Sequence, residues 1–291
     1  MIVTKIYAGL GNQLFQYAAG FAAAKRHNTY LMQDPGHYMY VAKAKAYPRN
    51  YKLDHYSVSY ASIFRLSADT MFGGLVKLGI TTNKLRDWCI ERSGLIYLRE
   101  SQDVAPSIIK DGSYLNGYWQ SEDYFSDYTK ELRAEFKLSK PLNDDNSKWL
   151  DAIKKTDCAI SIHFRRGDYQ KVDHLDGDYY LKALACLKNQ LDSKKLSLFV
   201  FSDQPELAKN FLGNMIKDKH MAYFVDVNTE QDGHFDLELM RNCKHHIIAN
   251  SSFSWWSAWL CENHNKIVVA PKSSEGRPLK TARPCKHWVT L

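Results

Sequence analysis

The sequence predicts an α/β protein of two domains, each with a doubly wound parallel sheet, facing each other across a cleft. Short apolar runs alternate with segments of helical periodicity over residues 159–270. Strand, helix and strand also follow one another near the N-terminus, which is the order of a βαβ unit. The polar, proline-containing segment 137–149 is a suitable linker. We therefore place the domains at residues 1–145 and 146–291.

The N-terminal domain begins with a β-branched run, residues 2–8, which reads as a strand. Residues 12–27 carry apolar side chains at helical spacing, and their basic end suits the negative end of a helix dipole. Residues 29–34 read as a second strand. Residues 35–150 are less regular, with helical patterns near residues 61–92.

The C-terminal domain shows the clearer pattern, five strands alternating with four helices, as in a doubly wound sheet. The expected strands are residues 158–164, 196–203, 222–227, 245–250 and 266–271. The expected helices are residues 178–191, 204–212, 236–243 and 252–262.

The composition excludes a disordered chain, because 45% of the residues are hydrophobic and 13% are aromatic. Lys and Arg number 39 against 32 acidic residues, and this net charge of +7 favours acidic partners such as phosphates and nucleotides. Basic residues do not form a stripe interleaved with aromatic ones, so we expect no nucleic acid partner.

The six cysteines form no CxxC pair, which favours a reducing compartment. The first residues do not resemble a secretory leader, and no apolar run approaches the roughly 20 residues that span a bilayer. We expect a cytoplasmic protein, and peripheral association with the inner face of the membrane remains open.

Three motifs follow expected strands, at the ends where ligands of open parallel sheets collect. The first is "GLGNQ", residues 9–13. The backbone at Gly11 can approach a ligand closely, and Asn12 and Gln13 can hydrogen-bond a sugar or a phosphate. The alternative is a tight turn with Asn12 as the N-cap of the helix.

The second motif is "HFRRGDY", residues 163–169. Arg165 and Arg166 leave a buried strand together, and their fork-shaped guanidinium donors match a phosphate. Asp168 could hold one of these arginines in place. The alternative is a solvated loop with a surface ion pair.

The third motif is "NSSFSWW", residues 250–256. Asn250 ends an apolar strand, and Ser251, Ser252 and Ser254 then begin a helix whose free N–H groups attract anions. The tryptophans that follow would pack the helix onto the sheet. The alternative is that the serines only cap the helix.

Two carboxylates complete the expected site. Asp203 ends a strand and Asp236 opens a helix, and either can accept hydrogen bonds from guanine or from ribose hydroxyls, or act as an N-cap. The string "DGDYY", residues 176–180, resembles the Asp-x-Asp of metal-dependent transferases, but it precedes a helix that acidic residues would cap. We expect no metal. Together the motifs indicate a diphosphate and an enzyme of nucleotides or nucleotide sugars.

Four blocks carry a family resemblance: "AGLGNQLFQYAAG", "ISIHFRRGDY", "FVFSD" and "DLELMRNCKHHIIANSSFSWWSAWL". They closely resemble the bacterial and animal α-1,2-fucosyltransferases of glycosyltransferase family 11. The resemblance implies a GT-B fold and inverting transfer of fucose from GDP-fucose to the 2-hydroxyl of a terminal galactose. It implies no metal or other cofactor, since GDP-fucose is a substrate. The C-terminal domain would hold GDP-fucose, and the N-terminal domain would face the glycan acceptor.

By this resemblance Arg165 and Arg166 would hold the diphosphate, and His163 and Asp236 would contact guanosine. The expected GDP-fucose site comprises Gly11, Asn12, Gln13, His163, Arg165, Arg166, Asp203, Asp236, Asn250, Ser251, Ser252, Phe253 and Ser254. The family's first block usually reads "GGLGNQ", and we expect Ala8 to be tolerated in place of its leading glycine. Residues 35–150 match the family weakly. The alternative is therefore a GDP-fucose-dependent fucosyltransferase with a different linkage or a different acceptor. A non-catalytic nucleotide or nucleic-acid binder is the alternative from another class.

An inverting displacement needs a group that accepts the proton of the attacking hydroxyl. The candidates are Asp34, His37, Asp168, Asp173 and His174. Distant relatives place a carboxylate about eight residues beyond the first arginine, which favours Asp173. We therefore expect Arg165, Asp168 and Asp173 to be the catalytic residues, with Asp168 mainly holding one of the two arginines.

Overall fold

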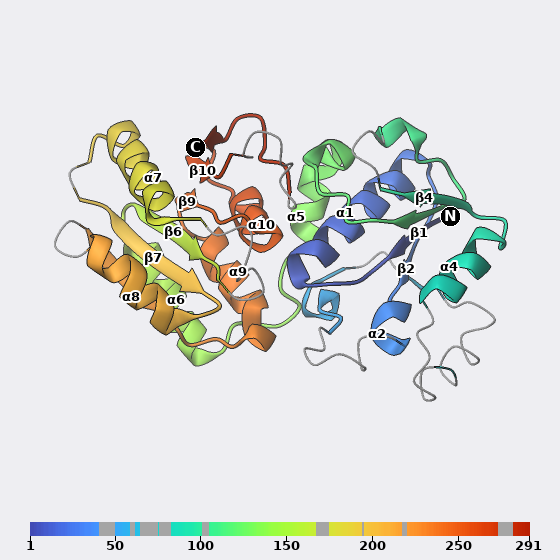
Figure 1. Ribbon diagram of the computed structural model, residues 1–291, viewed down its shortest axis with the longest axis horizontal. Helices are drawn as coiled ribbons and strands as arrows, with labels where there is room; N and C mark the ends of the chain where they lie inside the picture. The colour runs from blue at the N-terminus through green and yellow to red at the C-terminus, as the bar shows by residue number, and fades with distance from the viewer. Residues whose placement is uncertain are drawn as a thin grey trace. The chain divides into compact units, whose positions relative to one another are not determined.

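The computed structural model describes residues 1–40, 50–58, 62–64, 75, 83–100, 105–166, 175–193, 195–216, 220–272 and 282–291. They form two compact units, Met1–Lys140 and Pro141–Leu291 (Figure 1). The division falls inside the polar segment 137–149. The second half of that segment is not a linker, because helix α6 begins there and the side chain of Asn143 caps it.

The first unit contains a parallel sheet with the strand order β3-β2-β1-β5-β4. Its strands are β1 (Ile2–Lys5), β2 (Leu31–Asp34), β3 (Ser62–Ile63), β4 (Ile96–Arg99) and β5 (Ser113–Asn116). Its helices include α1 (Leu10–Arg26), α2 (Gly36–Tyr40), α4 (Asn83–Glu91) and α5 (Thr129–Glu135). Short 3-10 helices lie at Leu53–His55, Pro106–Ile108, Glu122–Tyr124 and Ser126–Tyr128. The expected βαβ unit at the N-terminus is confirmed.

Helix α1 packs unusually close to the sheet. A Cβ atom on Gly20 would lie 2.7 Å from Leu31 Cδ1 and 3.1 Å from Thr4 Cβ, so a larger residue would require these side chains to shift where the helix crosses β1 and β2. The helix starts earlier than expected, at Leu10, with Gly9 as its N-cap. Most of the "GLGNQ" motif therefore belongs to the first turn of a helix, and Asn12 is not the N-cap.

The second unit contains a six-stranded parallel sheet with the order β11-β10-β9-β6-β7-β8 (Figure 1). Its strands are β6 (Ala159–Phe164), β7 (Ser197–Ser202), β8 (Met221–Val225), β9 (His245–Ile247), β10 (Val268–Ala270) and β11 (Val289–Thr290). Its helices are α6 (Asp144–Lys155), α7 (Gly177–Gln190), α8 (Pro205–Ile216), α9 (Gly233–Arg241) and α10 (Ser252–Leu260), with a 3-10 turn at Glu230–Asp232. The alternation of strands and helices is confirmed.

Both faces of this sheet are covered by helices, as a doubly wound fold requires. On one face, Ile160, Ile162 and Phe164 of β6 pack in one buried cluster with α7 and α8. On the other face, Ala159 of β6 packs in a second cluster with α6 and α9. The two-residue period of the strand separates these two sets of side chains. Among the described helices, none is long and apolar enough to cross a bilayer.

Each sheet has one place where the direction of winding reverses. In the second unit β6 pairs with β7 on one side and β9 on the other, so the reversal lies between β6 and β9. In the first unit β1 pairs with β2 and with β5, so the reversal lies between β1 and β5. Ligands of open α/β sheets bind at the carboxyl ends of the strands at such points.

Candidate functional site

The candidate site of the second unit lies at the carboxyl ends of β6 and β9. These strands pair with Ile162 opposite Ile247, so the residues that follow them leave the sheet next to each other. The chain after β6 carries Arg165 and Arg166, and the chain after β9 leads through Asn250 into α10. The fold therefore brings the second and third sequence motifs to one edge.

A ring contact joins these two motifs directly. The centroid of the His163 ring lies 5.5 Å from that of Phe253, in the first turn of α10. Burial, reinforced by the positive charge of Arg165, lowers the pKa of His163 to about 3. The imidazole is therefore neutral, and its Nδ1 has no hydrogen-bond partner among the described residues. A neutral, buried ring nitrogen of this kind can hydrogen-bond a ligand at the strand end.

Asp203, at the end of the neighbouring strand β7, holds both arginines. Its Oδ2 lies 3.7 Å from Nη1 of Arg165, and its Oδ1 accepts a hydrogen bond of 3.2 Å from the backbone N–H of Arg166. The sequence predicts that Asp168 holds an arginine and that Asp203 either contacts the nucleoside or caps a helix. Asp168 lies outside the described residues, as does Asp173.

The two arginines have different surroundings. The Arg166 guanidinium stacks over the rings of Phe164 and Phe211, at 5.2 and 4.8 Å from their centroids, and so covers the α8 side of the sheet. The Arg165 guanidinium is partly buried beside Asp203, and its charge acts on His163. Arg165 is therefore the better placed of the two to meet an anion at the β6–β9 reversal.

The three serines of the third motif have different surroundings at the start of α10. Ser251 is the N-cap, and its hydroxyl accepts a hydrogen bond from the backbone N–H of Phe253 at 3.3 Å. Ser254 is fully buried and donates to the carbonyl of Ser251 at 3.3 Å, and its expected contact with the donor stays a prediction. Ser252 and Asn250 remain partly exposed beside the backbone amides of the turn.

Asp236 lies one turn into α9, which begins next to α10. A Cβ on Gly233 would lie 3.7 Å from the Phe253 ring. Asn228 donates to Asp236 Oδ1 at 2.7 Å, and the amides of Asn228 and Asn146 bond each other at 2.8 Å. Burial raises the pKa of Asp236 to about 7, so its charge changes near neutral pH.

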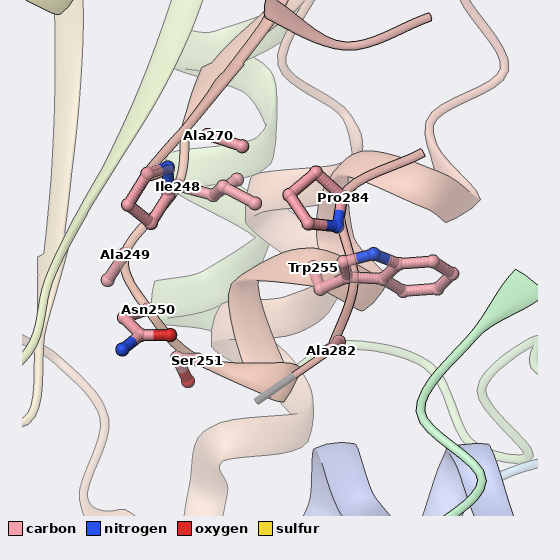
Figure 2. A pocket seen from close by; sticks show the side chains of 9 residues that line it. Ile248, Ala249, Asn250, Ser251, Trp255, Ala270, Ala282 and Pro284 are labelled. Atoms are coloured by element: carbon pink, nitrogen blue, oxygen red, sulfur yellow. The ribbon is translucent and has the colours of Figure 1, made fainter. Parts of the chain in front are cut away.

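A small pocket opens on the β10 side of the same helix start (Figure 2). Its walls are mainly apolar, and Asn250 and Ser251 supply its polar side chains. The lining residues are Ile248, Ala249, Asn250, Ser251, Trp255, Ala270, Pro271, Ala282 and Pro284. The Trp255 indole donates to the carbonyl of Arg283 at 2.8 Å, which holds the C-terminal segment against α10. Nothing in the sequence pattern indicated that Ala282 and Pro284 belong there.

The first motif is organised within the first unit. Gln13 is fully buried: its Nε2 donates to the carbonyls of Ala8 and Asn50 at 3.1 and 2.9 Å, and its Oε1 accepts from Lys52 N–H at 2.9 Å. These bonds use all of its amide hydrogens within the first unit, and the expected contact between Gln13 and the donor stays a prediction. Asn12 remains partly exposed and accepts a bond of 2.7 Å from the Gln120 side chain.

Gly11 and Asp34 are also buried. Gly11 lies inside the first turn of α1, where its backbone is part of the helix. Asp34 forms a buried ion pair with Arg86 and accepts hydrogen bonds from the Tyr114 hydroxyl and the Gly36 N–H. The Asp34 side chain is fully buried and held by these three donors, which disfavours a role as general base.

The first aspartate of the Asp-x-Asp string caps a helix, as expected. Asp176 is the N-cap of α7 and accepts from the N–H of Tyr179 at 3.0 Å. Within the described ranges, no group of three or more His, Cys, Asp or Glu side chains is arranged to hold a metal ion. Metal-independent action remains a prediction.

Comparison with known proteins gives consistent relatives. The family model described as Glycosyl transferase family 11 matches residues 76–291. The chain is similar to an alpha-1,2-colitosyltransferase of Escherichia coli, at 31% identity over 100% of this chain and 99% of that protein. It is also similar to the O-antigen biosynthesis glycosyltransferase WbnK of Escherichia coli, at 26% identity over 97% of this chain and 98% of that protein.

A more distant relative is a galactoside alpha-(1,2)-fucosyltransferase 1 of Bos taurus, at 22% identity over 61% of this chain and 52% of that protein. Among solved structures, Arabidopsis thaliana FUT1 in complex with GDP matches with a TM-score of 0.52, at 13% identity over 94% of this chain and 70% of that one. The two parallel-sheet units agree with the GT-B class of fold. By its family match and its relatives, the chain belongs to glycosyl transferase family 11.

Proposed function

We propose that this glycosyltransferase transfers L-fucose from GDP-fucose, with inversion, to the 2-hydroxyl of a terminal galactose on an oligosaccharide. The observation that carries the donor assignment is the contact between His163 and Phe253 beside the Arg165–Asp203 pair. It brings a guanidinium, a neutral imidazole and a helix N-terminus to the reversal point of one sheet. These groups suit a nucleoside diphosphate.

In this proposal the chain supports departure of GDP electrostatically. Negative charge grows on the diphosphate as the bond between the sugar C1 and the phosphate oxygen breaks. The Arg165 guanidinium and the free N–H groups of the first turn of α10 would stabilise that charge, and Asp203 would hold Arg165 in place. Asp236 would accept hydrogen bonds from the guanine N–H groups.

The acceptor hydroxyl would attack C1 from the opposite side and lose its proton. We retain Asp173 as the proposed general base, on the resemblance of the sequence alone. The Asp173→Asn variant should slow transfer far more than it weakens GDP binding. An equal loss of both would move this role to another residue.

Colitose transfer is the second candidate, because a relative at 31% identity is named an alpha-1,2-colitosyltransferase. The two are separated by supplying GDP-fucose or GDP-colitose with lactose and determining the linkage of the product by NMR. Our proposal predicts a fucosyl residue on the 2-hydroxyl of galactose. Turnover of GDP-colitose only would favour the second candidate, and another linkage would contradict the proposed regiochemistry.

We also propose that the protein acts in the cytoplasm and associates peripherally with anionic membranes. On α4, Leu85 and Trp88 are 39% and 50% exposed, and the Arg92 guanidinium stacks over the Trp88 ring at 4.1 Å. An exposed aromatic side chain on a helix, with a basic side chain directly after the helix end, suits an anionic bilayer surface. Sedimentation with phosphatidylglycerol vesicles tests this: wild-type protein should bind, and Trp88→Ala should bind less. Equal binding by both would remove α4 from the proposal.

A further inference from the structure

The first unit has an aromatic pair at the reversal point of its own sheet. Tyr7 follows β1 and Tyr118 follows β5, the two strands between which the winding reverses. The ring centroids lie 4.9 Å apart with 36° between the ring planes. Tyr118 is 36% exposed and Tyr7 is partly exposed. The pair thus occupies the position in the first unit that the candidate nucleotide site occupies in the second.

Backbone strain marks the same position on both strands. Ala8 has a φ of 67° and Trp119 a φ of 57°, and each immediately follows one of the paired tyrosines. The other described non-glycine residues with positive φ are Asn28 and Asp192, residue types that tolerate this region. Alanine and tryptophan do not, and such strain concentrates at binding and catalytic sites.

Polar groups surround the pair and hold the backbone after β5. The Glu100 carboxylate accepts hydrogen bonds from the N–H groups of Tyr118 and, at 3.3 Å, Gln120. Gln120 in turn bonds Asn12 at 2.7 Å, which connects this segment to the first turn of α1. The ring of His37 lies 5.9 Å from that of Tyr7. Burial raises the pKa of Tyr7, with Tyr118 and Glu100 adding to the shift, so its phenol remains a hydrogen-bond donor.

This combination suits a sugar better than a charged ligand. An aromatic face binds the apolar C–H face of a pyranose ring, and amide groups at its edge satisfy the sugar hydroxyls. Carboxylates beside the pair disfavour an anionic ligand such as a nucleotide: Glu100 is one, and Asp87, which pairs with Lys5 at 2.9 Å, is another.

We propose that Tyr118, backed by the ring of Tyr7, forms the platform on which a pyranose ring of the acceptor glycan stacks, with Asn12 and Gln120 bonding its hydroxyls. This inference deepens the proposed function, on which it rests, by locating its acceptor within the first unit. It gives Asn12 a contact with the acceptor in place of the expected contact with fucose.

The test is a comparison of sugar and nucleotide binding by the full chain. Saturation-transfer NMR would measure the affinity for lactose and for methyl β-D-galactopyranoside, and calorimetry the affinity for GDP. The variants are Tyr118→Ala, Tyr118→Phe, which keeps the ring, and Tyr30→Ala. Tyr30 is the matched control. It is 58% exposed and precedes β2, so it lies at the amino ends of the strands of the same sheet.

We expect Tyr118→Ala to weaken lactose binding about tenfold or more, as the loss of a stacked ring implies. Tyr118→Phe and Tyr30→Ala should bind lactose like the wild type, and all variants should bind GDP equally. Wild-type protein that binds neither sugar would overturn the inference. So would a Tyr118→Ala variant that binds lactose normally, or one that loses GDP binding.

The acceptor platform and the proposed reaction can fail independently of each other. If lactose binding depends on Tyr118 but the wild type transfers no fucose to lactose, the platform stands and the proposed reaction fails. If fucose is transferred and Tyr118→Ala leaves the KM for lactose unchanged, the reaction stands and the platform is wrong.

Discussion

Asp203 contacts both arginines that follow β6: its carboxylate lies 3.7 Å from Nη1 of Arg165 and accepts a hydrogen bond from Arg166 N–H. The same carboxylate orients the side chain of one arginine and the backbone of the other. Asp203 therefore prearranges the positive charge at the β6–β9 reversal point. Preorganised charge is the largest single contribution in many enzymes, and the arginines and their partner are the first residues to test.

Arg165→Ala should lower kcat at least a hundredfold while the protein stays folded, because a donor aimed at the leaving diphosphate is lost. Arg99→Ala is the matched control, since Arg99 lies on an edge strand with a 65% exposed side chain. Initial rates and a thermal melt measure both effects. Near-normal turnover by Arg165→Ala would remove this residue from the site.

Asp203→Asn should lower kcat by a smaller factor than Arg165→Ala, about tenfold. The amide oxygen can still accept the N–H of Arg166 but no longer attracts the Arg165 guanidinium. If Asp203 acts through Arg165, the double variant should be no slower than Arg165→Ala alone. Fully additive losses in the double-mutant cycle would show an independent role for Asp203.

GDP binding should depend on the charge of Asp236. The pKa of this carboxyl is raised to about 7, so the ionised form that accepts both guanine N–H groups becomes dominant only above that pH. At pH 8 the wild type should bind GDP about tenfold more tightly than Asp236→Asn, and the gap should close towards pH 6. The terminal phosphate of GDP titrates in the same pH range. Its effect is the same for both proteins, so the wild type is compared with Asp236→Asn at each pH.

The raised pKa of Asp236 also makes the free energy of unfolding depend on pH. Between about pH 4 and pH 7 the folded protein keeps a proton on Asp236 that the unfolded chain has lost, so this carboxyl contributes less stability as the pH rises. Urea unfolding at several pH values should show this trend in the wild type relative to Asp236→Asn. Parallel curves for the two proteins would contradict the raised pKa.

Ala8→Gly should raise the free energy of unfolding by up to about 1 kcal/mol. Ala8 has a φ of 67°, a left-handed conformation in which glycine is relaxed and alanine is strained. The greater freedom of glycine in the unfolded chain offsets part of the gain. Replacement of the family's leading glycine thus carries a cost in strain. A lower urea midpoint for Ala8→Gly would show that the alanine side chain is needed there.

Activity should be unchanged by EDTA and by added Mn²⁺. In our account the guanidinium of Arg165 and the first turn of α10 supply the positive charge that a metal ion would otherwise provide. Rates measured after chelation and dialysis test this. A strict need for a divalent ion would contradict this expectation.

The sheet of the second unit could be predicted because its strands carry an unambiguous signal. Strand β6 is buried on both faces and therefore reads as a continuous apolar run, bounded by turns and followed by an amphipathic helix. Strand β11 was missed because Val289–Thr290 is too short to show a period. The start of α1 was misplaced because Gly9 caps it without a side chain.

The site was predicted less completely, because a motif does not reveal which way its polar side chains point. Gln13 and Ser254 stand among residues expected to bind the donor, yet both bond their own chain in the interior. The partner of the arginines was sought nearby in sequence, at Asp168. The sheet order brings Asp203 beside them from the end of the neighbouring strand, while Asp168 lies outside the described residues. The positive φ angles of Ala8 and Trp119 have no sequence signal, since neither residue type favours them.

A crystal structure of the full chain with GDP tests the central claim most directly. We predict that the diphosphate lies at the carboxyl ends of β6 and β9, within hydrogen-bond distance of the Arg165 guanidinium and of backbone N–H groups in the first turn of α10. GDP bound away from these strand ends, out of contact with Arg165, would contradict the account.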